Sequence, residues 1–266
     1  MGAGGAAPAK ANPKGLAMGA VVPLVMRGPA PVLSWIPKTF GLPLRESTIA
    51  RLTDLYGQTD PGLARAFADG IEIDRVAAAG ASSPAAAATP PPAGPFRDFI
   101  ETAQTAAKFM SAADGPRVGA LAYNGWDTHA NEGAVKGQLA NRLGGLDAAL
   151  KAYADGMGEA WRDTVVVVVT EFGRTARVNG TDGTDHGTGT VALLAGGAVE
   201  GGRVIADWPG LADKALHEGR DLKPTQDLRA LLKGVLRDHL GLPVPALTDA
   251  VFPASAAVKP LDGLIV

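Results

Sequence analysis

Apolar runs alternate along the chain with stretches of helical apolar spacing, and this alternation predicts an α/β fold. Three apolar runs have the length and β-branched content of strands, and they cover residues 117–123, 164–170 and 190–197. The run TVVVVVT (164–170) has five valines without polar alternation, which is typical of a strand buried on both faces in a parallel sheet. Residues 16–26 predict a further buried strand, with Pro23 marking a bulge, an edge or its end.

Helical periodicity fills the intervals between these strands. Helices are predicted over residues 47–57, 61–79, 96–113, 134–156 and 225–240. Ser47 and Thr225 are candidate N-caps, and Gly57 is a candidate C-terminal glycine. One apolar face is expected within 134–156, formed by Leu139, Leu143, Leu146, Leu150 and Tyr153. Strands that alternate with helices predict a mostly parallel sheet with helices on both faces.

Two stretches stand apart from this pattern. Residues 1–14 are rich in Gly, Ala and Pro and are expected to be disordered. Residues 80–95, GASSPAAAATPPPAGP, have low complexity and predict an exposed loop. The remainder, 15–266, is expected to form a single domain that carries the loop as an insertion.

Composition narrows the classes of function. An apolar content of 46% with 20% charged residues indicates a globular protein with a substantial core. The net charge of −2 does not favour nucleic acid as a partner, and no apolar run is long enough for a transmembrane helix. The chain has no cysteine, so any metal must be held by oxygen and imidazole ligands.

Polar segments at the ends of the predicted strands are candidate sites, because α/β sheets bind ligands beyond the carboxyl ends of their strands. In NGWDTH, Asp127 and His129 are two residues apart, so both side chains point the same way in an extended segment. A carboxylate and an imidazole on one side suit zinc or manganese. Alternatively, Asp127 or Thr128 caps the following helix and His129 is merely exposed.

The segment EFGRT follows the valine run directly. Glu171 comes after a strand that is expected to be buried, where a carboxylate is either paired or bound to a metal. An ion pair between Glu171 and Arg174 is the simpler interpretation. Arg174 is also suited to face an anionic substrate through its planar guanidinium group.

The glycine-rich GTDGTDHGTG (180–189) allows sharp turns and close approach of the backbone to a ligand. Asp185 and His186 are adjacent, so one can ligate a metal while the other orients a neighbour. The alternative is a mobile surface turn. His217 and His239 are interpreted as structural.

Several motifs in order resemble one bacterial family. GWDTH, TEFGRT and GTDHG, followed by GGAVEGG and WPGL, resemble the family called domain of unknown function 1501 over residues 15–253. That family is placed with the alkaline-phosphatase-like proteins, a superfamily that includes sulfatases. The resemblance implies a parallel sheet between helices, with a metal cluster at its carboxyl edge.

The resemblance also implies roles for individual residues. Asp127, His129 and His186 match the ligands of one metal, with Asp185 beside them. Glu171 stands where the superfamily has an aspartate for a second metal, and Phe172 replaces a neighbouring histidine. The expected activity is metal-dependent hydrolysis of phosphate or sulfate esters. It would use zinc or manganese on a small anionic substrate held by Arg174.

The front of the chain departs from the family pattern. The family's export signal and its first Gly-Asp-Gly strand, which supplies the nucleophile, have no counterpart here. The chain therefore resembles the C-terminal two-thirds of a full member, and impaired hydrolysis is expected. A non-catalytic metal- or ligand-binding module of an exported protein is the alternative.

Overall fold

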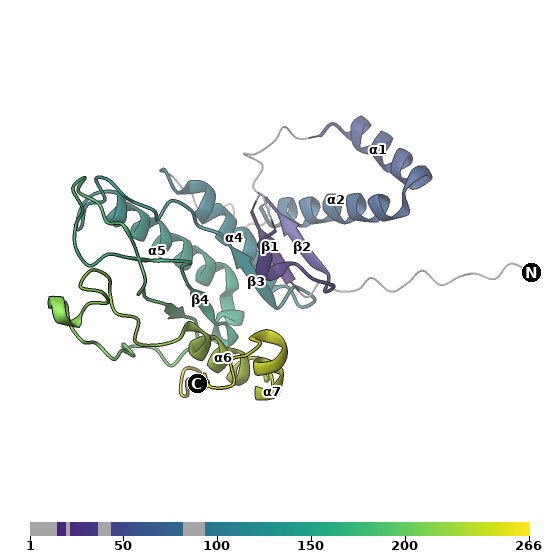
Figure 1. Cartoon of the computed structure of the whole chain (residues 1–266). Helices are drawn as coiled ribbons and strands as arrows, with labels where there is room; N and C mark the ends of the chain where they lie inside the picture. The colour runs from purple at the N-terminus through teal and green to yellow at the C-terminus, as the bar shows by residue number, and fades with distance from the viewer. Residues whose placement is uncertain (1–14, 20–21, 37–43, 82–93) are drawn as a thin grey trace, which may run out of the picture. The chain divides into compact units, whose positions relative to one another are not determined.

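The computed structural model describes residues 15–19, 22–36, 44–81 and 94–266 (Figure 1). Two compact units are present: one takes in Met1–Asn124 and Gly144–Gly158, the other Gly125–Leu143 and Glu159–Val266. The disorder expected over 1–14 and most of the loop expected over 80–95 lie outside the described residues. The single domain expected for 15–266 stays a prediction.

The first unit contains a three-stranded parallel sheet. Its strands are β1 (Gly15–Met18), β2 (Val32–Trp35) and β3 (Val118–Leu121), in the order β2-β1-β3. Strand β1 is central, and its residues Leu16 to Met18 are only 0–1% exposed. The α/β class is therefore confirmed, with a parallel sheet smaller than the one expected.

The buried strand predicted over 16–26 ends early. Residues 20–21 lie outside the described residues, and Leu24–Met26 forms the 3-10 helix η1. Leu24 and Val25 are largely exposed. The prediction was wrong for Leu24–Met26, because apolar character alone does not separate a strand from an exposed turn next to Pro23.

Four helices belong wholly or mostly to this unit: α1 (Glu46–Thr59), α2 (Pro61–Ala81), α4 (Arg97–Ser111) and α5 (Gln138–Met157). Helix α4 packs on β1 and β3, and α2 contacts β2 and α4. Ala103, Ala106 and Ala107 of α4 are buried. Their small side chains allow a close approach between helix and sheet.

The ends of α1 and the buried face of α5 differ from the predictions. Helix α1 begins after Arg45, one residue before Ser47, and it continues through Gly57. Tyr153 of the predicted face is buried, whereas Leu143 is exposed, and the other buried positions of α5 are Gly145, Ala149 and Met157. The small residues are buried because the neighbours come close. A Cβ on Gly145 would lie 2.5 Å from the hydroxyl of Tyr123 and 2.6 Å from Phe96.

The second unit has two short antiparallel pairs in place of a parallel sheet. Strand β4 (Val166–Val168) pairs with β7 (Leu193–Ala195), and β5 (Gly173–Arg174) pairs with β6 (His186–Gly187). The valine run was therefore wrongly predicted as a doubly buried parallel strand. Its three paired valines are only half-buried, because a two-stranded ribbon has too few neighbours to cover both faces.

Short helices complete this unit. They are η3 (Gly158–Asp163), η4 (Asp213–Ala215), α6 (Leu228–Asp238), α7 (Val244–Ala246) and the π-helical η5 (Leu247–Val251). Asp227, rather than the predicted Thr225, caps α6 by accepting a hydrogen bond from the backbone N–H of Arg229. Lys233 of α6 is fully buried and donates to the carbonyls of Ser255 (2.7 Å) and Val258 (2.9 Å). Within the described part of the chain, every helix is too short or too polar to cross a bilayer.

Candidate metal centre

Two irregular segments of the second unit, 127–132 and 179–184, are hydrogen-bonded to one another along their backbones. Asn131 and Glu132 donate to the carbonyls of Thr181 (3.0 Å) and Asp182 (2.8 Å). In return, the backbone N–H of Thr184 donates to the carbonyl of Thr128 at 3.3 Å. The two segments therefore form one layer of backbone without belonging to a regular sheet.

Asn179 fixes this layer through its side chain. Its amide nitrogen donates to the carbonyl of His129 (2.9 Å) and to Asp185 Oδ1 (3.0 Å), and its amide oxygen accepts from the backbone N–H of Gly183 (3.0 Å). Gly183 permits the close contact, since a Cβ there would lie 2.3 Å from the carbonyl carbon of His129. Asn179 thus links both candidate segments and was not singled out from the sequence.

The short β5–β6 pair brings in the remaining residues. Arg174 and His186 lie opposite each other in its register. The ring of Phe172 lies against the imidazole of His186, with centroids 4.6 Å apart and planes inclined by 30°. The guanidinium carbon of Arg174 is 5.7 Å from the centre of the same ring. Phe172 therefore packs against both polar side chains.

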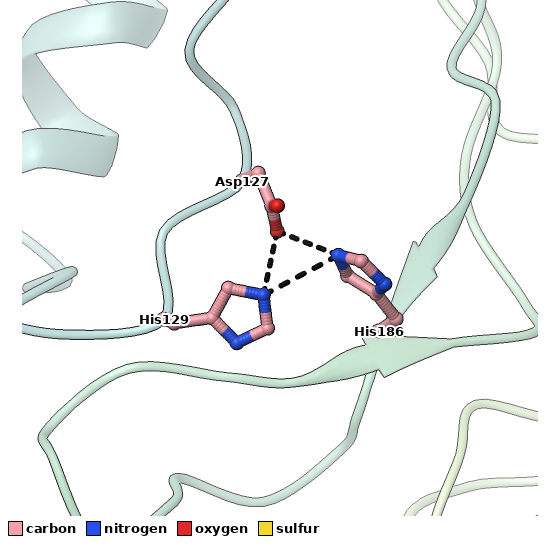
Figure 2. A group of neighbouring side chains, drawn as sticks. All are labelled: Asp127, His129 and His186. Atoms are coloured by element: carbon pink, nitrogen blue, oxygen red, sulfur yellow. Dashed lines mark hydrogen bonds and ion pairs between the residues drawn. The ribbon is translucent and has the colours of Figure 1, made fainter.

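Asp127, His129 and His186 form a compact triangle of ligand atoms (Figure 2). Oδ1 of Asp127 is 2.9 Å from Nε2 of His129 and 2.8 Å from Nε2 of His186, and the two nitrogens are 3.3 Å apart. Adjacent ligands of tetrahedral zinc, with bonds of about 2.0–2.1 Å, are separated by roughly 3.3 Å. The triangle is thus close to one face of a zinc coordination shell.

The protonation of His129 supports the same interpretation. Its Nδ1 lies 3.1 Å from Asp185 Oδ1, and a carboxylate in that position favours a proton on Nδ1. Nε2 then carries a lone pair directed at the oxygen of Asp127 and the nitrogen of His186. A cation placed among these three ligand atoms would be within reach of all of them.

Arg174 contacts this triangle from one side. Its Nη1 donates to Asp127 Oδ1 at 2.5 Å, its Nε donates to Thr184 Oγ1 at 2.8 Å, and its Nη2 donates to the carbonyl of Thr184. The ion pair of Arg174 is therefore made with Asp127, not with Glu171. Thr184 in turn donates to Glu132 Oε2 at 2.7 Å.

Electrostatics keep both carboxylates ionised. The hydrogen bond from Arg174 lowers the pKa of Asp127, and the two histidines act in the same direction. The hydrogen bonds from Asn179 and His129 lower the pKa of Asp185. An ionised Asp127 is the form that binds a metal, and an ionised Asp185 is the form that orients His129.

The structure brings together most of the predicted site residues but not all of them. Asp127, His129 and His186 form the triangle, with Asp185 and Arg174 in contact with it. Glu171 is exposed and lies outside this group. His217 and His239 also lie outside it, as expected.

A buried aspartate, which forms an isolated bridge with Thr175 next to β5, was missed in the sequence. Asp221 is 3% exposed, accepts from Thr188 Oγ1 at 2.9 Å and lies 2.8 Å from Nε of Arg220. Burial opposes ionisation of Asp221, but the hydrogen bonds from Thr188 and Arg220 keep its pKa below its usual range. A lone aspartate in the polar stretch HEGRDLK gave no signal of this role.

A family model described as "Protein of unknown function (DUF1501)" matches residues 26–250. The chain belongs to the DUF1501 family. No curated protein and no solved structure matches the chain. The matched range contains every residue of the triangle, together with Asp185 and Arg174.

Proposed function

We propose that this DUF1501 chain binds a divalent metal ion, zinc or manganese, and uses it to hydrolyse phosphate or sulfate esters. The observation that carries the proposal is the triangle of Asp127, His129 and His186. Its sides of 2.8–3.3 Å match the ligand spacing of a metal centre. Three protein ligands leave at least one position open, which is the pattern of catalytic rather than structural zinc.

The surroundings of the triangle suit a small anionic substrate. The three side chains are 47–56% exposed, so a substrate can reach them from solvent. A divalent ion held there would act as a Lewis acid and lower the pKa of a bound water. Asp185 holds His129 in the ligating tautomer, and the guanidinium group of Arg174 lies beside Asp127, where it can hold an anionic oxygen.

The order of the sequence motifs supports an alkaline-phosphatase-like origin for this chemistry. That superfamily is expected to use a second metal, with Glu171 at the corresponding strand end. Glu171 lies outside the triangle, so the proposal assigns one metal to the three grouped ligands. The same resemblance leads us to propose that the protein is exported.

A non-catalytic metal-binding module is the second candidate. Within the described residues, Asp127, His129 and His186 are the one group of three with suitable ligand spacing. A two-metal displacement, with both attacking and leaving oxygens stabilised, needs a second such group. A single centre without a second metal is therefore consistent with binding alone.

Metal content tests the assignment. After dialysis against metal-free buffer and reloading with zinc or manganese, the wild-type protein should hold about one ion per chain. Asp127→Ala and His186→Ala should hold markedly less, because each removes a ligand. His239→Ala is the matched control and should equal the wild type, since His239 ends α6 outside the group. Equal metal content in all four proteins would refute the ligand assignment.

Hydrolysis of p-nitrophenyl phosphate and p-nitrophenyl sulfate separates the two candidates. An enzyme should release p-nitrophenol only when it is loaded with metal, and Asp127→Ala should abolish the release. A wild-type protein that holds metal but does not turn over either ester would favour the binding module.

A further inference from the structure

One carboxylate oxygen is shared by three partners. Asp127 Oδ1 contacts Nη1 of Arg174 at 2.5 Å, as well as Nε2 of His186 and of His129. The shortest of these contacts is with the guanidinium group. The hydrogen bond from Nη1 occupies one lone pair of Oδ1, and that lone pair is then not free to bind a metal. The guanidinium group of Arg174 therefore occupies a position that a cation would take on this oxygen.

The guanidinium group is anchored along its opposite edge. Nε and Nη2 donate to the hydroxyl and the carbonyl of Thr184. Thr184 is in turn fixed through Glu132, and the side chain of Arg174 is only 21% exposed. Rotation of Arg174 away from Asp127 would break these hydrogen bonds. A metal ion that arrives without an anion therefore meets the positive charge next to the oxygen.

We propose that Arg174 competes with the divalent metal for Asp127 Oδ1, and that an anion which accepts from Nη1 relieves this competition. This inference rests on the proposed function, because it takes Asp127 as a metal ligand. It makes Arg174 a positioning residue that links the two ligands of the site. Metal binds more tightly when a tetrahedral anion is present, and the anion binds more tightly when metal is present.

The chemistry of the two acceptors supports this coupling. The negative charge of Asp127 is delocalised over two carboxylate oxygens, and Oδ1 also contacts the two histidines. A tetrahedral oxyanion brings several charged oxygens that suit the donors of a guanidinium group. An anion that accepts from Nη1 takes over this hydrogen bond while Nε and Nη2 stay on Thr184, so Oδ1 regains the lone pair that a metal needs. The substrate class indicated is thus an ester with a tetrahedral anionic head, as in a sulfate or phosphate ester.

Zinc affinity, measured by isothermal titration calorimetry on the full chain, tests the proposal. Arg174→Gln removes the competing charge, and it should bind zinc on the order of tenfold more tightly than the wild type. Arg174→Met is a second neutral variant, and its apolar chain can still cover the ring of Phe172. Arg177→Gln is the matched control, because Arg177 pairs with Asp213 away from the site. It should bind zinc as the wild type does.

Sulfate is the anion to add, since it leaves zinc in solution. It should tighten zinc binding by the wild type severalfold, and by less in Arg174→Gln. Equal or weaker zinc binding by both neutral variants would overturn the competition, and would mean that Arg174 supports Asp127 as a ligand. An equal effect of sulfate on wild type and variant would overturn the coupling. Absence of zinc binding by wild type and variants alike would refute the metal site itself, a result distinct from the other two.

Discussion

The parallel sheet of the first unit and the layer around Asp127 in the second are stabilised by different interactions. Strand β1 is almost fully buried between β2 and β3, under the small side chains of α4. The candidate metal ligands are about half exposed, and their positions depend on hydrogen bonds between irregular segments. Apolar burial stabilises the parallel sheet of the first unit. In the second unit, hydrogen bonds from polar side chains fix the loops that carry the candidate metal ligands.

The largest effect on the site is expected from Gly183→Ala. A Cβ there would lie 2.3 Å from the carbonyl carbon of His129, so the two segments must move apart. Bound metal should fall to background, with a loss in stability of about 1–3 kcal/mol. Gly180→Ala is the control in the same loop, since a Cβ there meets nothing within 4 Å. Elemental analysis and urea denaturation would measure both effects, and normal metal content in Gly183→Ala would contradict the proposed packing.

The opposite pattern is expected from Leu16→Ala in β1. Leu16 is 0% exposed, and truncation of a buried leucine costs about 2–5 kcal/mol in the free energy of unfolding. Metal content of the folded protein should not change, because no ligand is touched. Leu24→Ala removes the same atoms from an exposed position and should change stability by less than about 0.5 kcal/mol. Equal destabilisation by the two substitutions would show that β1 is not the core of its unit.

A moderate effect on metal affinity is expected from Asn179→Ala. The substitution leaves the three ligands intact but removes the amide that holds the His129 carbonyl and Asp185. Loss of such supporting contacts typically weakens metal binding about 10–100-fold. Asn141→Ala, at an exposed position of α5, is the control. A calorimetric zinc affinity equal to that of the wild type would remove Asn179 from the site.

The smallest effect concerns the first unit at alkaline pH. Burial raises the pKa of Tyr153 to about 12, from an ordinary value near 10. Its phenol therefore ionises more readily in the unfolded chain, so stability is present below about pH 10 and is lost as the pH rises towards 12. Between pH 9 and 11, the wild type should lose about 1 kcal/mol more than Tyr153→Phe in urea denaturation. Parallel losses in the two proteins would contradict the shift.

The grouping of Asp127, His129 and His186 was easier to predict from the sequence than the sheet. Asp127, His129 and His186 were identifiable because histidine is rare in this chain and lies in polar segments next to acids and glycine. The prediction of a parallel strand for the valine run was wrong, because five β-branched residues indicate a strand without indicating its partner or its direction. Pairing of β4 with β7 is a long-range property that no local pattern contains.

The supporting residues were missed for a related reason. Asn179 and Thr184 are common turn residues, and their importance arises from contacts with segments about 50 positions away in the chain. The displacement of Glu171 from the group has a similar origin. It follows β4, whose antiparallel pairing differs from the parallel strand end that was expected.

Because Lys233 is fully buried, chemical labelling of its amine can measure local unfolding. Its amine is enclosed by the carbonyls of Ser255 and Val258, so acylating reagents cannot reach it while α6 and the C-terminal segment stay together. An exposed amine such as that of Lys151 is open to the reagent in the folded protein. When the reagent reacts faster than the segment closes again, the labelling rate of Lys233 equals the rate at which the C-terminal part of the second unit opens, and mass spectrometry of its peptide would follow that opening.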